Sequence, residues 1–148
     1  MKILLAVDDS KFSSAATQAL SAQIPDRNSE VLVLEVVEPL YFSAPPEMAP
    51  NYAPEMALRQ KDEIKHANET VIRNAEALRR AGFTKVNSKV MEGETRSSIL
   101  NTAADWRPDL IVLGSHGRKG IQRFLLGSVA EFVARHAPCS VLVVRSAA

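Results

Sequence analysis

The segment GSHGRKGIQRFLLGS, from Gly114 to Ser128, holds four glycines and follows the apolar run DLIVL. Two residues separate Gly114 from Gly117, and nine separate Gly117 from Gly127. Because glycine has no Cβ, the chain at such positions can bring backbone N–H groups close to an anion. The segment is therefore either a simple turn after a strand or a site that holds phosphate.

The end of the segment favours phosphate. Gly127 and Ser128 fall where a helix is expected to begin, and a helix N-terminus offers unpaired N–H groups and a partial positive charge. The Ser128 hydroxyl would add a donor or cap that helix. Arg118, Lys119 and Arg123 lie inside the segment and would offset phosphate charge. Both glycine ends must then converge on one ligand.

Three other glycine motifs do not fit this sequence. A P-loop requires GxxxxGK followed by Ser or Thr, and Lys119 is not followed by either. A dinucleotide fingerprint requires GxGxxG after the first strand, whereas residues 8–14 contain no glycine. A nucleophile elbow requires GxSxG, whereas Ser115 directly follows Gly114.

Apolar runs and turn signals predict alternating strands and helices around this segment. Strands are expected at 3–7, 30–38, 84–92, 109–114 and 140–145. Helices are expected after a Ser10 N-cap and over about 55–81, 96–105 and 128–137. This order predicts one domain, 1–148, of the α/β class. It would be a single open parallel five-stranded sheet with helices on both faces, Rossmann-like, with strand order 3-2-1-4-5.

Residues 39–54, PLYFSAPPEMAPNYAP, hold five of the eight prolines. Proline lacks a backbone donor and clashes in a helix interior, so we predict a long loop here. The loop would leave the second strand at the edge of the sheet where ligands bind. It is therefore a candidate lid or dimer contact.

Ligands of open α/β sheets bind outside the carboxyl ends of the strands. Asp8 ends the first strand, Val36 lies near the end of the second, and Gly114 ends the fourth, so they share one edge. Asp8 can accept hydrogen bonds from an amine or a hydroxyl, and Val36 and Leu113 can form an apolar wall for a base. Asp109 begins its strand and is expected at the opposite edge.

Four stretches carry a resemblance that spans the chain: AVDDS at 6–10, EVVEP at 35–39, GSHG…GS, and APCSVLVV at 137–144. With them the chain resembles the ATP-binding branch of the universal stress protein family. The resemblance implies that Asp8 and Val36 contact adenine and ribose. It departs at Asp9, where many members carry glycine. Together with the physical argument, it predicts these binding residues: Ala6, Val7, Asp8, Val36, Leu113, Gly114, His116, Gly117, Arg118, Gly127, Ser128 and Val129.

The same resemblance implies ATP as the ligand, with Mg²⁺ held by the phosphates rather than by protein side chains. It also implies a homodimer, joined through the last strand at Val141, Leu142, Val143 and Val144. His66 and His136 lie on predicted helices far from any cysteine cluster, so no zinc site is expected.

Composition excludes several classes of function. The 148 residues carry a formal net charge of +1, which argues against an electrostatic nucleic-acid or membrane-surface binder. The single cysteine, Cys139, permits no internal disulfide. The N-terminal apolar run is too short for a secretion signal, so a cytoplasmic protein is expected.

Three functions remain open. The first is an ATP-binding stress-response or regulatory protein that acts through a homodimer. The second is a slow ATPase or phosphotransferase, and the third is an interaction module that binds no nucleotide. Rapid phosphoryl transfer needs Mg²⁺ ligands and a positioned base, and the motif supplies neither a Walker-type lysine nor a paired carboxylate. We therefore predict no catalytic residues and at most slow hydrolysis.

Overall fold

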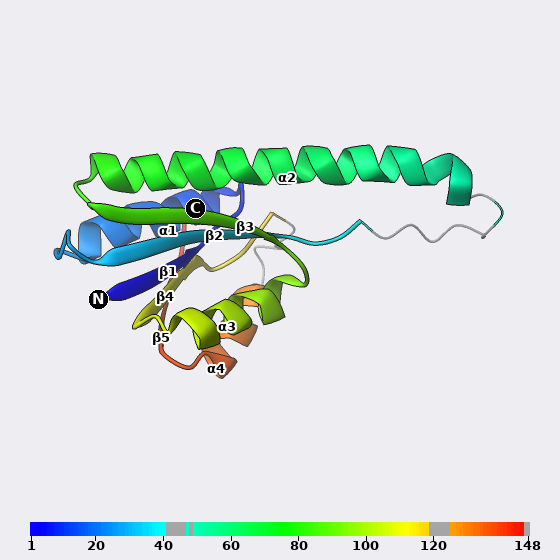
Figure 1. The fold of residues 1–148 in the computed structure, drawn as a ribbon. Coiled ribbons are helices and arrows are strands. Elements are labelled where there is room, and N and C mark those ends of the chain that lie inside the picture. Colours follow the sequence, from blue (N-terminus) through cyan, green and yellow to red (C-terminus); the bar gives the residue numbers. More distant parts are fainter. Residues whose placement is uncertain (41–46, 48, 119–124, 147–148) are drawn as a thin grey trace.

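The computed structural model describes residues 1–40, 47, 49–118 and 125–146. In these residues, strands and helices alternate along the chain (Figure 1). They are β1 (Lys2–Ala6), α1 (Lys11–Gln23), β2 (Glu30–Val37), α2 (Ala49–Arg80), β3 (Lys85–Glu92), α3 (Thr95–Trp106), β4 (Leu110–Gly114), α4 (Ser128–His136) and β5 (Ser140–Val144).

The five strands form one parallel sheet in the order β3-β2-β1-β4-β5, which confirms the predicted topology. Leu4 of β1 pairs with Leu32 of β2 on one side and with Ile111 of β4 on the other. β2 and β3 therefore lie on one side of β1, and β4 and β5 lie on the other. Strand order reverses between β1 and β4, where ligand clefts form in open sheets.

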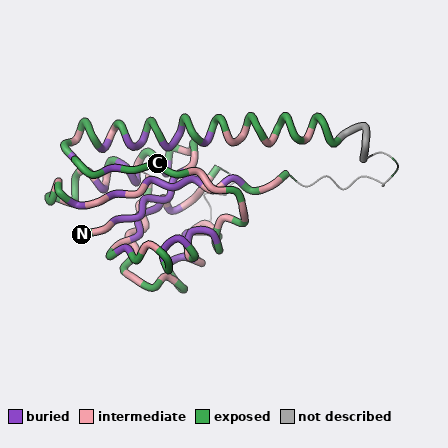
Figure 2. Tube along the Cα trace, viewed as in Figure 1, coloured by how far each residue is buried: buried purple, intermediate pink, exposed green. Residues whose placement is uncertain are grey.

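Helices cover both faces of the sheet, as predicted. Successive side chains of a strand point to opposite faces, so Ile3 and Leu5 pack with α1 and α2, whereas Leu4 packs with α3 and α4. Figures 1 and 2 show the two helical layers, with the buried residues concentrated on the central strands.

Local signals fix two of the helix boundaries. Ser10 is the N-cap of α1, and its side chain accepts a hydrogen bond from the Ser13 N–H at 3.4 Å, as predicted. Gly82 follows α2 with a φ of 103°, a left-handed conformation that favours glycine. These caps set where the chain leaves one layer and enters the next strand.

The predicted loop 39–54 is wrong at its second half, because α2 begins at Ala49 and contains Pro54. The first-turn N–H groups of a helix have no intrahelical partner, so Pro50 costs no helical hydrogen bond. Pro54, one turn further on, removes only one. The candidate lid or dimer contact is the whole predicted loop 39–54; residues 41–46 and 48 of it lie outside the described residues, and its role stays a prediction.

Among the described side chains of α2, the buried apolar residues lie in its C-terminal half, from Ala67 to Leu78. Leu58, nearer the N-terminus, is 64% exposed. Thr17 of α1 donates a buried hydrogen bond to the Asn74 side chain at 2.7 Å, which docks the two helices. Figure 1 shows α2 extending beyond the sheet at its N-terminal end. Although α2 has 32 residues, no helix in the described part is long and apolar enough to cross a membrane.

Leu78→Ala tests this division of α2. Leu78 is fully buried, so its truncation should lower the free energy of unfolding by about 2–5 kcal/mol. Leu58→Ala on the same helix is the matched control and should change it by less than about 0.5 kcal/mol. Urea denaturation monitored by circular dichroism measures both, and equal losses would contradict the packing described.

Candidate functional site

A cleft of about 850 Å³ lies at the carboxyl edge of the sheet, between the ends of β1, β2 and β4, the start of α4 and one side of α2. The structure brings the predicted binding residues together along it, and their role in binding stays a prediction. The lining includes Ala6, Val7, Asp8, Val36, Leu113, Gly114, His116, Gly117, Arg118, Gly127, Ser128 and Val129. Asp109 lies at the opposite edge, as predicted, where its N–H donates a hydrogen bond to the Lys2 carbonyl oxygen.

The two glycine ends of the segment meet directly. The Gly127 N–H donates a hydrogen bond to the Ser115 carbonyl oxygen at 2.7 Å. A Cβ on Gly127 would lie 3.1 Å from that oxygen and 3.2 Å from the His116 Cα. Glycine at 127 therefore allows the N-terminus of α4 to press against the end of β4. Lys119 and Arg123, expected to offset phosphate charge, lie outside the described residues.

Packing against α1 is one reason for glycine at 114. A Cβ there would lie 2.6 Å from the Phe12 Cβ and 2.8 Å from the Phe12 backbone. The sequence did not indicate this contact, in which α1 occupies the space beside Gly114, and the expected role of Gly114 in binding stays a prediction. A Cβ on Gly117 would lie 2.9 Å from the Asp8 carboxylate, so glycine at 117 lets the segment lie close to the Asp8 side chain.

The N-terminus of α4 is capped differently from the prediction. Gly127, not Ser128, is the N-cap, and it has no side chain to bond the first turn. Ser128 is the first helical residue and is exposed. The N–H groups of Ser128, Val129 and Ala130 precede the first intrahelical donor, Glu131, which bonds the Gly127 carbonyl. All three residues line the cleft, so this helix end faces it with unpaired helical donors.

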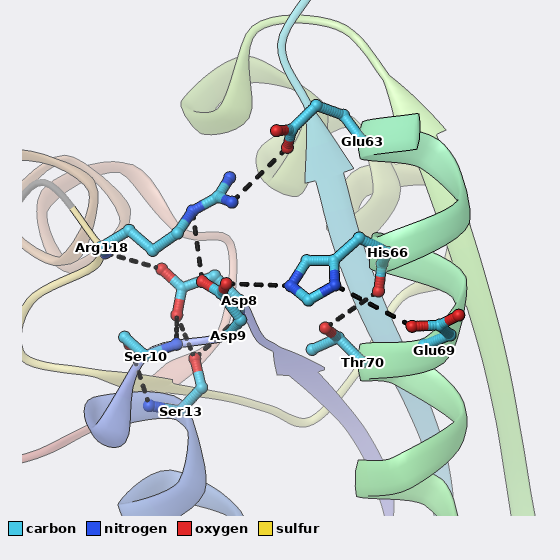
Figure 3. Close-up of polar contacts among 9 residues, drawn as sticks. All are labelled: Asp8, Asp9, Ser10, Ser13, Glu63, His66, Glu69, Thr70 and Arg118. Carbon is cyan, nitrogen blue, oxygen red and sulfur yellow. Dashed lines mark hydrogen bonds and ion pairs between the residues drawn. The ribbon is translucent and has the colours of Figure 1, made fainter. Parts of the chain in front are cut away.

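Asp8 holds the glycine segment to the first strand. Its Oδ1 accepts hydrogen bonds from the Ser10 N–H at 2.9 Å and the Ser13 hydroxyl at 2.8 Å, and its Oδ2 accepts one from the Arg118 N–H at 3.0 Å (Figure 3). A carboxylate has about four acceptor positions, so about one remains for a ligand. Asp8 is thus mainly an anchor, which the motif alone did not indicate.

Arg118 connects the segment to α2. Its Nε lies 3.3 Å from the Asp9 carboxylate and its guanidinium lies 3.5 Å from Glu63, while His66 Nε2 lies 3.0 Å from Asp9 (Figure 3). These pairs are part-exposed, so each is weak alone, but together they join three segments of the chain. Asp9, the departure from the family pattern, is the residue that both Arg118 and His66 contact.

Glu35 is a buried site residue that sequence reasoning missed. It lines the cleft, is only 3% exposed, and its Oε2 has no hydrogen-bond partner among the described residues. Burial raises the pKa of its carboxyl group to about 7; Arg118 and His66 oppose this rise, and Asp8 and Asp9 add to it. The available signal was one charged residue inside the apolar run EVLVLEVVE.

Glu63 and Glu38 also line the cleft without having been predicted. Glu63 lies on α2, far from the glycine segment in the sequence. No sequence pattern indicates that it lies close to Arg118. Glu38 accepts hydrogen bonds from the Thr95 N–H at 3.2 Å and its hydroxyl at 3.0 Å, which joins β2 to the start of α3. Across the described ranges, no group of His, Cys, Asp and Glu is arranged to hold a metal ion.

The sheet order and the edge cleft define a Rossmann-like α/β protein. The profile of the universal stress protein family matches residues 1–145, and the chain belongs to this family. Universal stress protein YxiE from Bacillus subtilis is 28% identical over 145 residues, covering 97% of this chain and 98% of the relative. A putative universal stress protein from Staphylococcus haemolyticus is 42% identical over 72 residues, or 48% of this chain and 44% of the relative.

Solved structures agree with the family assignment. Universal stress protein UspA from Lactobacillus plantarum has a TM-score of 0.85 at 25% identity, covering 98% of this chain and 97% of that one. A universal stress protein from Archaeoglobus fulgidus in complex with dAMP shares the fold, with a TM-score of 0.66 at 20% identity and 97% of each chain covered.

Glu35→Gln should change how stability depends on pH. Because the pKa of Glu35 is raised on folding from 4.5 to about 7, its neutral form suits the folded state. The contribution of Glu35 to stability is then fully present below about pH 4.5 and is lost as the pH rises to about 7, by at most about 3 kcal/mol. Glutamine stays neutral, so the advantage of the variant over wild type should grow between about pH 5 and pH 8. Denaturation curves at both pH values measure it, and a constant difference would contradict the account.

Proposed function

We propose that this protein binds ATP in the cleft at the carboxyl edge of the sheet and acts as a stress-response or regulatory protein of the ATP-binding branch. The observation that carries the proposal is the direct contact between the end of β4 and the N-terminus of α4, through Gly127 and Ser115. This contact puts unpaired helical N–H groups beside a cleft large enough for a nucleotide.

The phosphates would bind at the start of α4. The N–H groups of Ser128, Val129 and Ala130 point away from the helix toward its N-terminal end, where the helix dipole also favours negative charge. Arg118 lines the same cleft and supplies a cation from the glycine segment. Backbone donors and one guanidinium together suit a polyphosphate, whose charge is spread over many oxygens.

The base and ribose would lie toward β1 and β2. Leu34, Val36 and Leu113 line that part of the cleft with apolar side chains. The remaining acceptor position of Asp8 suits an amine or a hydroxyl. The Archaeoglobus fulgidus relative was solved with dAMP, an adenine nucleotide, which supports this class of ligand.

Charge balance supports a divalent cation on the phosphates. The cleft is lined by the carboxyl groups of Asp8, Glu35, Glu38 and Glu63, with Arg118 as a cation beside them. Polyphosphate would add negative charge to an acidic surface, and Mg²⁺ bound to its oxygens would reduce this cost. The described residues offer no metal-binding group of their own, so the phosphates would hold the ion.

We expect binding without rapid turnover. Fast phosphoryl transfer needs a positioned base or nucleophile, and Asp8 is occupied by three protein donors. Release of phosphate at an enzymatic rate from added ATP would favour the phosphotransferase alternative.

The proposed homodimer would form through β5. Within the described chain, β5 pairs only with β4, so one side of it presents open backbone donors and acceptors. Its apolar residues Val141, Leu142, Val143 and Val144 are only partly buried. An exposed apolar edge strand is an attractive pairing surface, and a second copy of β5 would cover it.

Gly117→Val tests the proposed ATP site. A side chain at 117 would meet the Asp8 carboxylate and enter the cleft, so ATP affinity should fall by at least about tenfold. Isothermal titration calorimetry with MgATP measures it. The matched control Asn87→Val, on the exposed strand β3, should bind as wild type. Equal affinity for Gly117→Val, or no binding by wild type, would refute the proposal.

Val143→Lys tests the proposed dimer. A lysine on β5 would place charge in the apolar contact, so sedimentation velocity should show monomers where wild type sediments as a dimer. Ser88→Lys, on the exposed opposite edge strand, should leave the dimer intact. A monomeric wild type, or a dimeric Val143→Lys with native circular dichroism, would rule out this interface.

A further inference from the structure

Glu35 lies where the cleft meets the inner side of α2. On β2 its side chain shares a face with Val33 and Val37, the face that α1 and α2 cover, and in the sheet it pairs with Val90 of β3. It nevertheless lines the cleft. An ionisable group in this position is costly unless it is paired, and such groups concentrate at functional sites.

The charged groups that act on Glu35 come from three segments. Asp8 and Asp9 follow β1, His66 lies on α2, and Arg118 follows β4. The Asp8 carboxylate accepts three hydrogen bonds, and Asp9 contacts both His66 and Arg118. Glu35 differs from these aspartates, because the described residues provide no hydrogen-bond donor to its buried Oε2.

Glu63 completes the set of charges around Arg118. It lies on α2, is about half exposed, and contacts the guanidinium at 3.5 Å. Arg118 is therefore shared between acidic side chains before any ligand arrives. It is also the cation that most favours the charged form of Glu35.

An anionic ligand in the cleft would favour the neutral form of Glu35 over its charged form. Phosphate oxygens near Arg118 would compete with the carboxyl groups for the guanidinium and offset its positive charge. The charged form of Glu35 would then lose the cation that most favours it, which raises the pKa of its carboxyl group. Glu35 is the group most ready to become neutral, because burial already disfavours its charged form and no described residue donates a hydrogen bond to its Oε2.

We propose that Glu35 is a further residue of the binding site, and that the cleft takes up a proton at its carboxyl group when the phosphates of a nucleotide bind. The inference rests on the proposed function, since it requires an anionic ligand in this cleft. The proton balance is simple: the carboxylate of the free protein becomes a carboxylic acid in the complex. Nucleotide affinity therefore falls as the pH rises. Occupancy of the cleft then depends on both the nucleotide concentration and the pH.

The test compares MgATP affinity in wild type and Glu35→Gln by calorimetry between about pH 7 and pH 8.5. Glutamine resembles the neutral acid, so the variant needs no proton to bind. The ratio of the wild-type Kd to the variant Kd should rise by up to about tenfold per pH unit. This ratio cancels the titration of ATP itself. Glu63→Gln removes a carboxylate from the same arginine, and His66→Gln removes the nearby imidazole. Both variants keep Glu35, so their MgATP affinity should still fall as the pH rises, over a pH range shifted by the lost charge.

A second measurement needs no variant. Titrations of wild type at about pH 8 in two buffers of different ionisation enthalpy report the protons exchanged, and we expect uptake of up to about one proton per bound nucleotide. No uptake, a ratio that is constant with pH, or a pH dependence lost in His66→Gln would overturn the role of Glu35 while leaving ATP binding in place. A wild type that binds no nucleotide would overturn both.

Discussion

The hydrogen bond from the Gly127 N–H to the Ser115 carbonyl is the contact on which the site depends. It joins the start of α4 to the end of β4 at 2.7 Å, and no side chain at 127 stands between them. The parallel sheet supplies the edge, and the reversal of strand order between β1 and β4 opens space there. In the proposed function, the close approach of a helix N-terminus would give that space an affinity for anions.

A second constraint is that an anion-facing helix end lies next to an acidic surface. Asp8 fixes the backbone of Arg118, while Asp9 and Glu63 hold its guanidinium, so α2 is connected to the glycine segment through charge (Figure 3). Glu35 is buried near these charged residues, and burial disfavours the charged form of its carboxyl group. In the proposed function, phosphate would change the balance of these charges, and a divalent cation on the phosphates and a proton at Glu35 would compensate for it.

The sequence was sufficient for the sheet because its signals are local. Buried runs such as ILLAV and caps such as Ser10 report strand and helix positions directly, and parallel topology follows from their alternation. The sequence-based prediction was wrong at Pro54, because a proline near the start of a helix removes few helical hydrogen bonds and destabilises the helix little. Contacts between distant segments were also hidden: Phe12 beside Gly114 and Glu63 beside Arg118 depend on how elements pack. Glu35 left a visible signal, a charge within an apolar strand, but its environment came only from the structure.

A crystal structure of the protein grown with MgATP would test the central claim most directly. The account predicts triphosphate density against the first-turn N–H groups of α4 and the segment from Gly114 to Arg118, with the adenine toward Val36 and Leu113. An empty cleft at saturating MgATP, or a nucleotide bound elsewhere on the protein, would contradict it.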